Sequence, residues 1–286
     1  MDKLQLIECP RDAMQGLKAF IETEKKITYI NQLLKVGFDT LDFGSFVSPK
    51  AIPQLADTAK VLAGLELEKS KSKLLAIVAN ERGANDAVNF DEINYLGFPF
   101  SISETFQQRN TNSSINQSLT RVEAIQNLCI KHHKKMVVYI SMGFGNPYGD
   151  AYSPEIATQW SEKLAKDLEI EIISLSDTIG VSNRANIEHL FSTLIPELPK
   201  VSFGAHLHTT PTDWLEKVDA AYKSGCRRFD GALKGFGGCP MAADDLTGNM
   251  PTEKMVGYFQ ENKIESGLNT DEFVTAMQIA SDIFPE

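Results

Sequence analysis

The segment that decides the fold is "MVVYISMGFGNPYGDAYSPEIATQWSEKLAKDLEIEIISLS" (136–176), which has the order strand, loop, helix, strand. The apolar run 136–141 ends in a glycine-rich polar loop. The stretch 153–169 then begins with Ser-Pro and places Ile156, Trp160 and Leu164 on one face, as in an amphipathic helix. A second apolar run follows at 171–176. This spacing is typical of two parallel strands joined by a helix.

The same unit recurs along the chain about eight times, with no long linker between units. The predicted strands are 4–8, 38–43, 73–79, 93–100, 136–141, 171–176, 201–208 and 226–233. Eight such units in 286 residues predict an α/β fold, a TIM (β/α)8 barrel with its active site at the C-terminal ends of the strands. A doubly wound open sheet is the alternative. We expect residues 1–286 to form a single catalytic domain, with C-terminal helices (about 250–286) packed on the barrel. The polar stretch 107–119 is predicted to be a long loop that opens a helix.

Composition narrows the function classes. The formal charge of −10 argues against general nucleic-acid binding, which needs a basic surface. The four cysteines (Cys9, Cys129, Cys226 and Cys239) are scattered, so they support neither a zinc knuckle nor a disulfide scaffold. The first ten residues lack the apolar core of a signal peptide, and no apolar run is long enough to span a bilayer. We therefore expect a cytoplasmic protein with free thiols that binds no membrane.

Polar residues follow most of the predicted strands, where a barrel builds its active site. Each group lies just after a strand and so points to the same rim: Arg11 and Asp12 after the first, Asp42 at the end of the second, Ser141 at the end of the fifth, Asp177 and Thr178 after the sixth, His206 and His208 at the end of the seventh, and Cys239 and Asn249 after the eighth.

His206 and His208 give the sharpest signal. Residues two apart on a strand point to the same face, so both imidazoles can enter one cavity. With one carboxylate they would form a three-ligand metal site, for which Asp12 is the best candidate and Asp177 and Asp42 come next. The plainer interpretation is two unrelated histidines packed at a strand end.

Three other residues each have a plainer interpretation beside the functional one. Arg11 next to Asp12 is either a surface ion pair or a group that stabilises an oxyanion. Cys239 is either a packed thiol or a reactive one in a glycine-rich loop with room for substrate. Asn249 either caps the helix that begins near residue 250 or offers its amide oxygen to a hard cation.

Five motifs together resemble the 3-hydroxy-3-methylglutaryl-CoA lyase family, within the metal-dependent DRE-TIM carbon–carbon lyases. They are "PRDAMQ" (10–15), "SFVSPK" (45–50), "SLSDTIG" (174–180), "HLHTT" (206–210) and "GFGGCPMAADDLTGN" (235–249). The resemblance runs from the first predicted strand to beyond residue 250. The second and the last of these motifs point to the lyase branch rather than to the related synthases.

The resemblance implies cleavage of 3-hydroxy-3-methylglutaryl-CoA to acetoacetate and acetyl-CoA. It implies a divalent cation, Mg²⁺ or Mn²⁺, an acyl-CoA substrate and a homodimer, and it is compatible with leucine breakdown. The implied metal ligands are Asp12, His206, His208 and Asn249. The implied catalytic residues are Arg11, Asp42, His206 and Cys239. Gln15, Ser141, Asp177 and Thr178 are assigned to the substrate or to support of these groups.

The chain departs from the family's motifs at several positions. Cys9 and Ala13 replace glycines that flank the Pro-Arg-Asp motif, and Asp42 replaces a glutamate. Thr209 replaces an aspartate next to the histidine pair. All the implied metal ligands are kept, so we expect metal binding and lyase chemistry. These changes leave the substrate's identity open.

Three other functions are compatible with parts of the pattern. The first is a related lyase or aldolase that acts on a different 3-hydroxyacyl-CoA or 2-keto acid. The second is an iron oxygenase, because two histidines and a carboxylate also bind Fe(II), but such sites usually lie in β-sandwiches. The third is an inactive barrel used for binding, against which the retained site residues argue.

Overall fold

The structure is a computed structural model that describes residues 3–238 and 247–284. Eight parallel strands form a closed barrel in which β1 pairs with both β2 and β8, and β6 pairs with β7. The predicted TIM barrel is therefore confirmed, and the open sheet is excluded. The strands are β1 (Gln5–Glu8), β2 (Thr40–Ser45), β3 (Lys73–Ile77), β4 (Ile93–Ser101), β5 (Lys135–Ser141), β6 (Ile172–Asp177), β7 (Ser202–Thr209) and β8 (Arg228–Gly231). Each overlaps one of the eight predicted strands.

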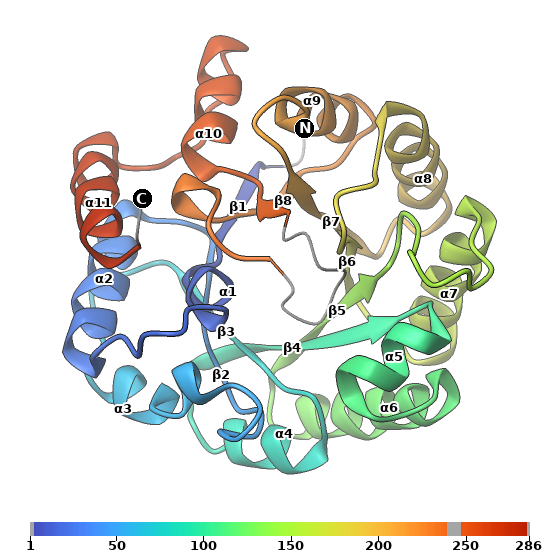
Figure 1. The fold of residues 1–286 in the computed structure, drawn as a ribbon, viewed down its shortest axis with the longest axis horizontal. Coiled ribbons are helices and arrows are strands. Elements are labelled where there is room, and N and C mark those ends of the chain that lie inside the picture. The colour runs from blue at the N-terminus through green and yellow to red at the C-terminus, as the bar shows by residue number, and fades with distance from the viewer. Residues whose placement is uncertain (1–2, 239–246, 285–286) are drawn as a thin grey trace.

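Helices surround the strands as an outer ring (Figure 1). In the described residues they are α1 (Pro10–Gln15), α2 (Thr23–Val36), α3 (Thr58–Ala63), α4 (Glu81–Ala87), α5 (Glu104–Thr111), α6 (Ile115–Lys131), α7 (Pro154–Asp167), α8 (Arg184–Glu197), α9 (Trp214–Lys223), α10 (Thr252–Glu261) and α11 (Thr270–Ile283). Short 3-10 turns lie at Pro53–Leu55 and Leu233–Gly235. A two-residue strand, β9 (Gly248–Asn249), pairs antiparallel with β7.

The alternation of side chains along each strand divides the core in two. A large apolar cluster fills the space between the strands and the helices. A smaller cluster inside the barrel contains Leu75, Tyr95, Val137, Tyr139 and Ile172. Since side chains fill the barrel, polar chemistry is confined to its two ends.

The polar stretch 107–119, predicted to be a loop, is largely helical. α5 continues to Thr111 and ends at Asn112, which takes the left-handed conformation with φ +49°. Ser114 then caps α6 by a reciprocal capping box with Gln117. The loop prediction was wrong because polar residues here are helix caps and solvent-facing side chains rather than a break in the chain.

The C-terminal helix α11 packs mainly on α2. Phe284, just after α11, lies edge-on to Tyr29 at 5.9 Å between ring centroids and stacks on Phe236 at 4.8 Å. Phe236 begins the glycine-rich loop of the predicted site. The end of the chain therefore supports one side of that loop.

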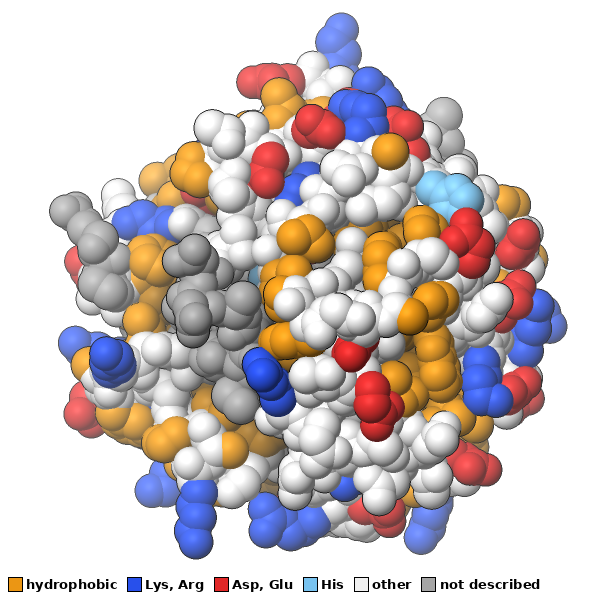
Figure 2. All heavy atoms as spheres, turned by 45° about the vertical axis from the view of Figure 1, so that its right-hand side comes forward, with side chains coloured by type: hydrophobic (Ala, Val, Ile, Leu, Met, Phe, Trp, Pro, Cys, Tyr) orange, Lys and Arg blue, Asp and Glu red, His pale blue; other side chains and the backbone are white. Residues whose placement is uncertain are grey.

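On the face in Figure 2, charged side chains of both signs are scattered and are most frequent toward the margin, and uncharged and hydrophobic side chains make up most of the middle. Among the residues that the structure describes, no helix is both long and apolar enough to cross a membrane.

Candidate active site

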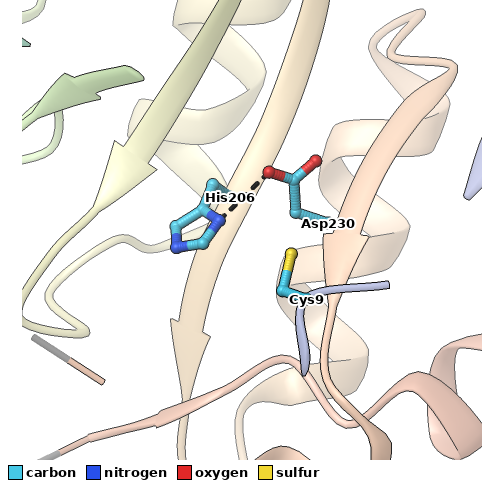
Figure 3. Close-up of side chains that lie close together, drawn as sticks. All are labelled: Cys9, His206 and Asp230. Carbon is cyan, nitrogen blue, oxygen red and sulfur yellow. Dashed lines mark hydrogen bonds and ion pairs between the residues drawn. The ribbon is translucent and has the colours of Figure 1, made fainter. Parts of the chain in front are cut away.

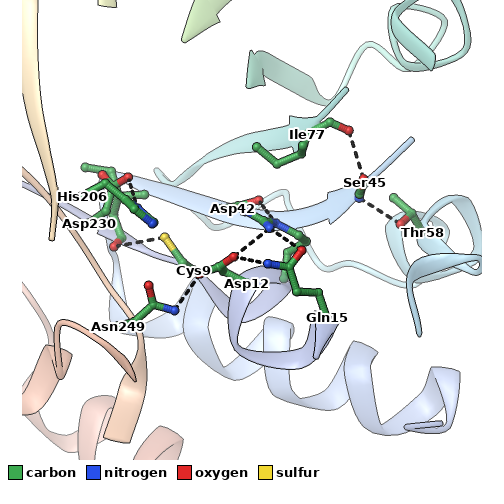
Figure 4. Close-up of polar contacts among 12 residues, drawn as sticks. Cys9, Asp12, Gln15, Asp42, Ser45, Thr58, Ile77, His206, Asp230 and Asn249 are labelled. Carbon is green, nitrogen blue, oxygen red and sulfur yellow. Dashed lines mark hydrogen bonds and ion pairs between the residues drawn. The ribbon is translucent and has the colours of Figure 1, made fainter. Parts of the chain in front are cut away.

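Side chains from three elements meet at the C-terminal ends of the strands (Figure 4). Asp12 comes from α1 directly after β1, His206 and His208 from β7, and Asn249 from β9. One ligand atom from each of Asp12, His206 and His208 lies within 4.8 Å of the others. Asn249 is opposite His208 in the β7–β9 pairing, and its Nδ2 donates to Asp12 Oδ2 at 2.7 Å. The four predicted metal ligands are therefore neighbours.

Both imidazoles are oriented by their Nδ1 atoms. His206 Nδ1 lies 3.1 Å from Asp230 Oδ2, and His208 Nδ1 lies 3.0 Å from the carbonyl oxygen of Thr178. Because both partners are acceptors, each Nδ1 carries a proton, and in the neutral rings Nε2 keeps its lone pair. Burial lowers the pKa of His206, but Asp230 outweighs burial and raises it, so His206 holds a second proton more readily than His208 does. This is the arrangement of metal-binding histidines, whose second nitrogen is held by a carboxylate or a carbonyl.

The ionisation states of His208 and Asp12 favour the binding of a cation. Burial lowers the pKa of His208 to about 4, and His206 beside it acts in the same direction. Burial works against the carboxylate of Asp12, but Arg11 and the two histidines outweigh it and lower its pKa. A neutral imidazole and an ionised carboxylate are the forms that bind metal. The residues present therefore fit a divalent cation.

Arg11 lies between the two carboxylates of the site. Its Nε donates to Asp42 Oδ2 and Oδ1 at 3.0 and 3.2 Å, and Nη2 donates to Oδ2 as well. Its Nη1 donates to Asp12 Oδ1 and to Gln15 Oε1, both at 2.9 Å. Arg11 is buried, so the surface ion pair considered from sequence is excluded. Burial raises the pKa of Asp42 to about 6, although Arg11 lowers it.

Asp42 and Gln15 support Arg11 from two sides. The pairing of β2 with β3 shifts register between Asp42 and Gly44, next to this ion pair. Gln15, on the last turn of α1, also donates to Asp12 Oδ1. Both predicted residues therefore belong to the same hydrogen-bonded group as Asp12.

Asp177, considered from sequence as a metal ligand, forms its hydrogen bonds with other residues. Its Oδ2 accepts from Lys217 Nζ at 3.0 Å and from the Ser182 backbone, and its Oδ1 accepts from the Val181 backbone. Lys217 also donates to the carbonyl of His208 at 2.8 Å. Asp177 therefore holds the loop after β6 and, through Lys217, the end of β7.

The remaining predicted residues have simpler surroundings. The Thr178 hydroxyl accepts from the Met142 backbone at 2.8 Å, while its carbonyl holds His208. Ser141 is buried at the end of β5, and no hydrogen bond among the described residues joins its side chain to the metal ligands. Thr209, which replaces the family's aspartate, donates to the carbonyl of Asn249 at 3.3 Å and so ties β7 to β9.

Cys239 lies outside the described residues. The loop that leads to it is described as far as Gly238. At Gly237, with φ +103°, a Cβ would lie 2.4 Å from Asn249 Nδ2 and 2.8 Å from the carbonyl oxygen of Asp12. Only glycine fits there, because the backbone passes directly over the predicted ligands. Asn249 Nδ2 also donates to the carbonyl of Phe236 at 2.8 Å. Asn249 therefore anchors the loop, and α10 begins after Pro251 without it.

Two residues in this region were missed from sequence. Asp230 projects from β8 toward His206, and Cys9 lies beside both (Figure 3). Burial, together with the nearby carboxylates, raises the pKa of the Cys9 thiol well above its usual range, so it stays protonated. The inward direction of Asp230 on a parallel strand was the available signal, because it occupies the barrel face that also supplies His206.

Comparisons with known proteins agree with this geometry. A family model described as HMGL-like matches residues 3–280. Hydroxymethylglutaryl-CoA lyase YngG of Bacillus subtilis is 34% identical over 267 residues, which cover 93% of this chain and 88% of that protein. The 3-hydroxy-3-isohexenylglutaryl-CoA/hydroxy-methylglutaryl-CoA lyase of Pseudomonas aeruginosa is 32% identical, covering 96% and 91%.

Solved structures give the same result. The chain is similar to an HMG-CoA lyase from Acinetobacter baumannii in complex with coenzyme A and 3-methylmalate. The TM-score is 0.89 at 31% identity, and the match covers 98% of this chain and 91% of that one. The carboxyl transferase domain of Rhizobium etli pyruvate carboxylase matches with a TM-score of 0.69 at 16% identity, which shows a shared fold alone.

Proposed function

The chain belongs to the HMGL-like family, and we propose on this basis that it cleaves 3-hydroxy-3-methylglutaryl-CoA to acetoacetate and acetyl-CoA with a divalent cation. It is an enzyme of the carbon–carbon lyase class. The observation that carries the proposal is the placement of Asp12, His206 and His208 around one point, with Arg11 beside them. This set of donors suits a cleavage in which oxygen atoms gain negative charge.

Asp12, His206, His208 and Asn249 would hold the cation, which when bound supplies a Lewis acid for the hydroxyl and carboxyl oxygens of the substrate. We propose Mg²⁺ or Mn²⁺, as the resemblance implies, because carboxylate and amide oxygens suit these cations. Asp230 and the Thr178 carbonyl fix the two imidazoles, so the ligand atoms are in place before the cation arrives.

The reaction needs one proton removed and one returned. The tertiary hydroxyl loses its proton, its electrons form the ketone of acetoacetate, and the bond between C2 and C3 breaks. The electron pair of that bond goes to the acetyl-CoA enolate, whose methylene carbon then takes a proton. We assign these two transfers to His206 and Cys239, as the resemblance implies. If Nε2 of His206 held the cation, its Nδ1, which faces Asp230, would be the ring nitrogen that exchanges a proton.

Arg11 would stabilise the enolate oxygen. Its guanidinium is already oriented by Asp42 and Gln15, so little reorganisation is needed when charge develops. Both oxygens of Asp42 are engaged by Arg11, and its side chain is 1% exposed. We therefore assign Asp42 to holding Arg11 rather than to contact with substrate.

The alternative is a related lyase reaction on a different 3-hydroxyacyl-CoA or 2-keto acid. One relative's name includes a substrate with a longer group at C3, and Thr209 and Asp42 are departures near the site. We also propose one catalytic domain over residues 1–286, a homodimer, a cytoplasmic location and a role in leucine breakdown. The homodimer and the role in leucine breakdown rest on the resemblance to the family, whereas the single domain and the cytoplasmic location rest on the sequence pattern.

Product identification tests the proposal. We expect the protein with Mg²⁺ or Mn²⁺ to convert 3-hydroxy-3-methylglutaryl-CoA to acetoacetate and acetyl-CoA in equal amounts, measured by mass spectrometry. A folded, metal-loaded protein that releases neither product would contradict it. If longer 3-hydroxyacyl-CoA esters are then cleaved at the same bond, the alternative substrate is established.

A further inference from the structure

A cavity lies at the end of the barrel opposite the candidate active site, where the strands begin. Its volume is about 690 Å³, and it is lined by the first residues of several strands, among them Gln5, Lys73, Lys135, Ser202 and Arg228. The apolar cluster inside the barrel separates it from the candidate active site. Tyr95 and Ile172 of that cluster line the cavity, whereas Tyr139 of the same cluster packs edge-on against His206 with 5.6 Å between ring centroids.

The cavity is cationic in an acidic protein. Five lysine and arginine side chains and two histidines line it, against the carboxylates of Asp91 and Glu171. Lys135 Nζ is paired with Glu171 Oε2 at 2.7 Å, and Lys134 donates to two backbone carbonyls. Lys73 and Lys200 are exposed at the rim. A concave site lined by charge of one sign concentrates ions of the other sign.

Arg228 is the central group. It is 2% exposed and begins β8 with its side chain against Gly204 of β7, where a Cβ would lie 3.3 Å from Arg228 Cδ. Its guanidinium is 6.0 Å from the centre of the Tyr95 ring. Among residues 3–238 and 247–284, its Nε and Nη2 have no hydrogen-bond partner.

The carboxylate nearest to Arg228 belongs to Asp39 and leaves those two donors unmatched. Its Oδ1 lies 3.9 Å from Arg228 Nη1, beyond hydrogen-bond distance, and accepts from the Thr40 hydroxyl at 2.9 Å. Gln5 Nε2 is close to Asp39 Oδ2 at 3.4 Å. A buried guanidinium with unmatched N–H groups is costly, and an oxyanion with several acceptor atoms removes that cost.

We propose that this cavity is a binding site for a phosphate-type oxyanion, with Arg228 as its main ligand and Lys73 and Lys200 at its rim. The fork of an arginine matches two oxygens of a tetrahedral anion, and lysines add charge without fixed direction. The anion is either free phosphate or the phosphate group of a nucleotide. The site is distinct from the acyl-CoA site, which belongs to the other end of the barrel.

Calorimetry of the metal-loaded protein with sodium phosphate, at constant ionic strength set by sodium chloride, tests the proposal. We expect saturable binding by the parent and a loss of at least about tenfold in affinity for Arg228→Met. Lys163→Met, with the same charge change on an exposed part of α7, should bind phosphate as the parent does. Separate titrations with ADP and adenosine distinguish free phosphate from a nucleotide.

Lys200→Gln changes only the exposed rim, so it is informative even if Arg228→Met fails to fold. It should weaken phosphate binding by roughly twofold to fivefold, the scale of one partly screened charge. Equal binding by Lys200→Gln and the parent, or by a folded Arg228→Met and the parent, would overturn the proposal. Heats that match those of chloride at the same ionic strength would also overturn it. None of these readouts depends on lyase activity.

Discussion

The guanidinium of Arg11 binds both oxygens of Asp42, with Nε at 3.0 and 3.2 Å, and reaches Asp12 with a separate nitrogen. One cationic side chain thus links the residue that replaces a family glutamate to a predicted metal ligand. This ion pair between Arg11 and Asp42 depends on the negative charge of Asp42. Burial raises the pKa of the Asp42 carboxyl to about 6.

Asp42→Asn should lower kcat by roughly 10²-fold or more, because an amide cannot hold the guanidinium as an ion pair does. In the parent, protonation of Asp42 weakens its ion pair with Arg11, so kcat should fall as the pH drops through about 6. This fall of kcat at acidic pH should be absent from the residual activity of Asp42→Asn. Asp42→Glu, which keeps the charge, is the matched control. If kcat of Asp42→Asn falls with pH as in the parent, a group other than Asp42 causes that pH dependence.

His208→Ala should abolish tight cation binding while leaving the barrel folded. The imidazole is held by the Thr178 carbonyl and faces Asp12, so its removal takes one ligand from the set. Metal content after dialysis, with circular dichroism as the folding control, checks this prediction. Normal metal content in the variant would remove His208 from the ligand set.

Asp230→Asn should weaken cation binding by roughly 10–100-fold, although Asp230 is not itself a predicted ligand. Its carboxylate accepts the Nδ1 proton of His206 at 3.1 Å and thereby fixes the tautomer that presents Nε2 to the cation. Titration with Mn²⁺ by electron paramagnetic resonance measures the affinity. Asp167→Asn, on the exposed surface of α7, serves as a control. Equal affinity in Asp230→Asn and the parent would show that His206 keeps its orientation without this carboxylate.

The sequence was sufficient to predict the barrel and much of the site for one physical reason. Parallel strands joined by helices place all their C-terminal ends on one rim, so residues far apart in sequence, such as Asp12 and His208, become neighbours. Alternation along β7 then places His206 and His208 on the same face. Neither step requires knowledge of side-chain packing.

The features of the site that depend on side-chain packing could not be predicted from the sequence. The sequence signal for Asp177 as a ligand was as good as that for Asp42, but Lys217 from α9 neutralises it in the structure. Asp230 offered only its inward direction on β8 as a signal, because its contact with His206 depends on the direction in which that ring turns. The helix α5 was taken for a loop, because caps and exposed polar side chains have the composition of a loop.

Glu8 provides a test of stability. It is fully buried at the end of β1, where Oε1 accepts from the Leu233 backbone and Oε2 from the Thr252 hydroxyl. Burial raises its pKa from 4.5 to about 8. The folded state therefore binds a proton that the unfolded state releases, and stability falls as the pH rises from about 4.5 to about 8, by at most about 1.4 kcal/mol per pH unit.

Glu8→Gln should remove this pH dependence, because a glutamine amide accepts from Leu233 and donates to Thr252 without ionising. Urea unfolding of the parent and the variant at pH 5 and pH 8 measures the difference in the free energy of unfolding. The variant should gain stability relative to the parent at pH 8. The same stability difference at both pH values would mean that Glu8 is ionised in the folded protein.

Cys239→Ala should keep cation and substrate binding but lower kcat by roughly 10²–10⁴-fold, the usual scale for a proton-transfer group. Cys129→Ala, a buried thiol on α6, is the control for removal of a sulfur atom. Steady-state kinetics with 3-hydroxy-3-methylglutaryl-CoA separates kcat from KM. A kcat within about a factor of two of that of the parent would show that the Cys239 thiol has a packing role and transfers no proton.

The most direct measurement is a titration of the metal-free protein with Mn²⁺, in which bound metal and acetyl-CoA release are followed in the same samples. If Asp12, His206, His208 and Asn249 form one catalytic metal site, activity should be absent after treatment with EDTA. It should then rise in proportion to bound Mn²⁺, up to one ion per chain. Full turnover by the metal-free protein would contradict the assignment of this site.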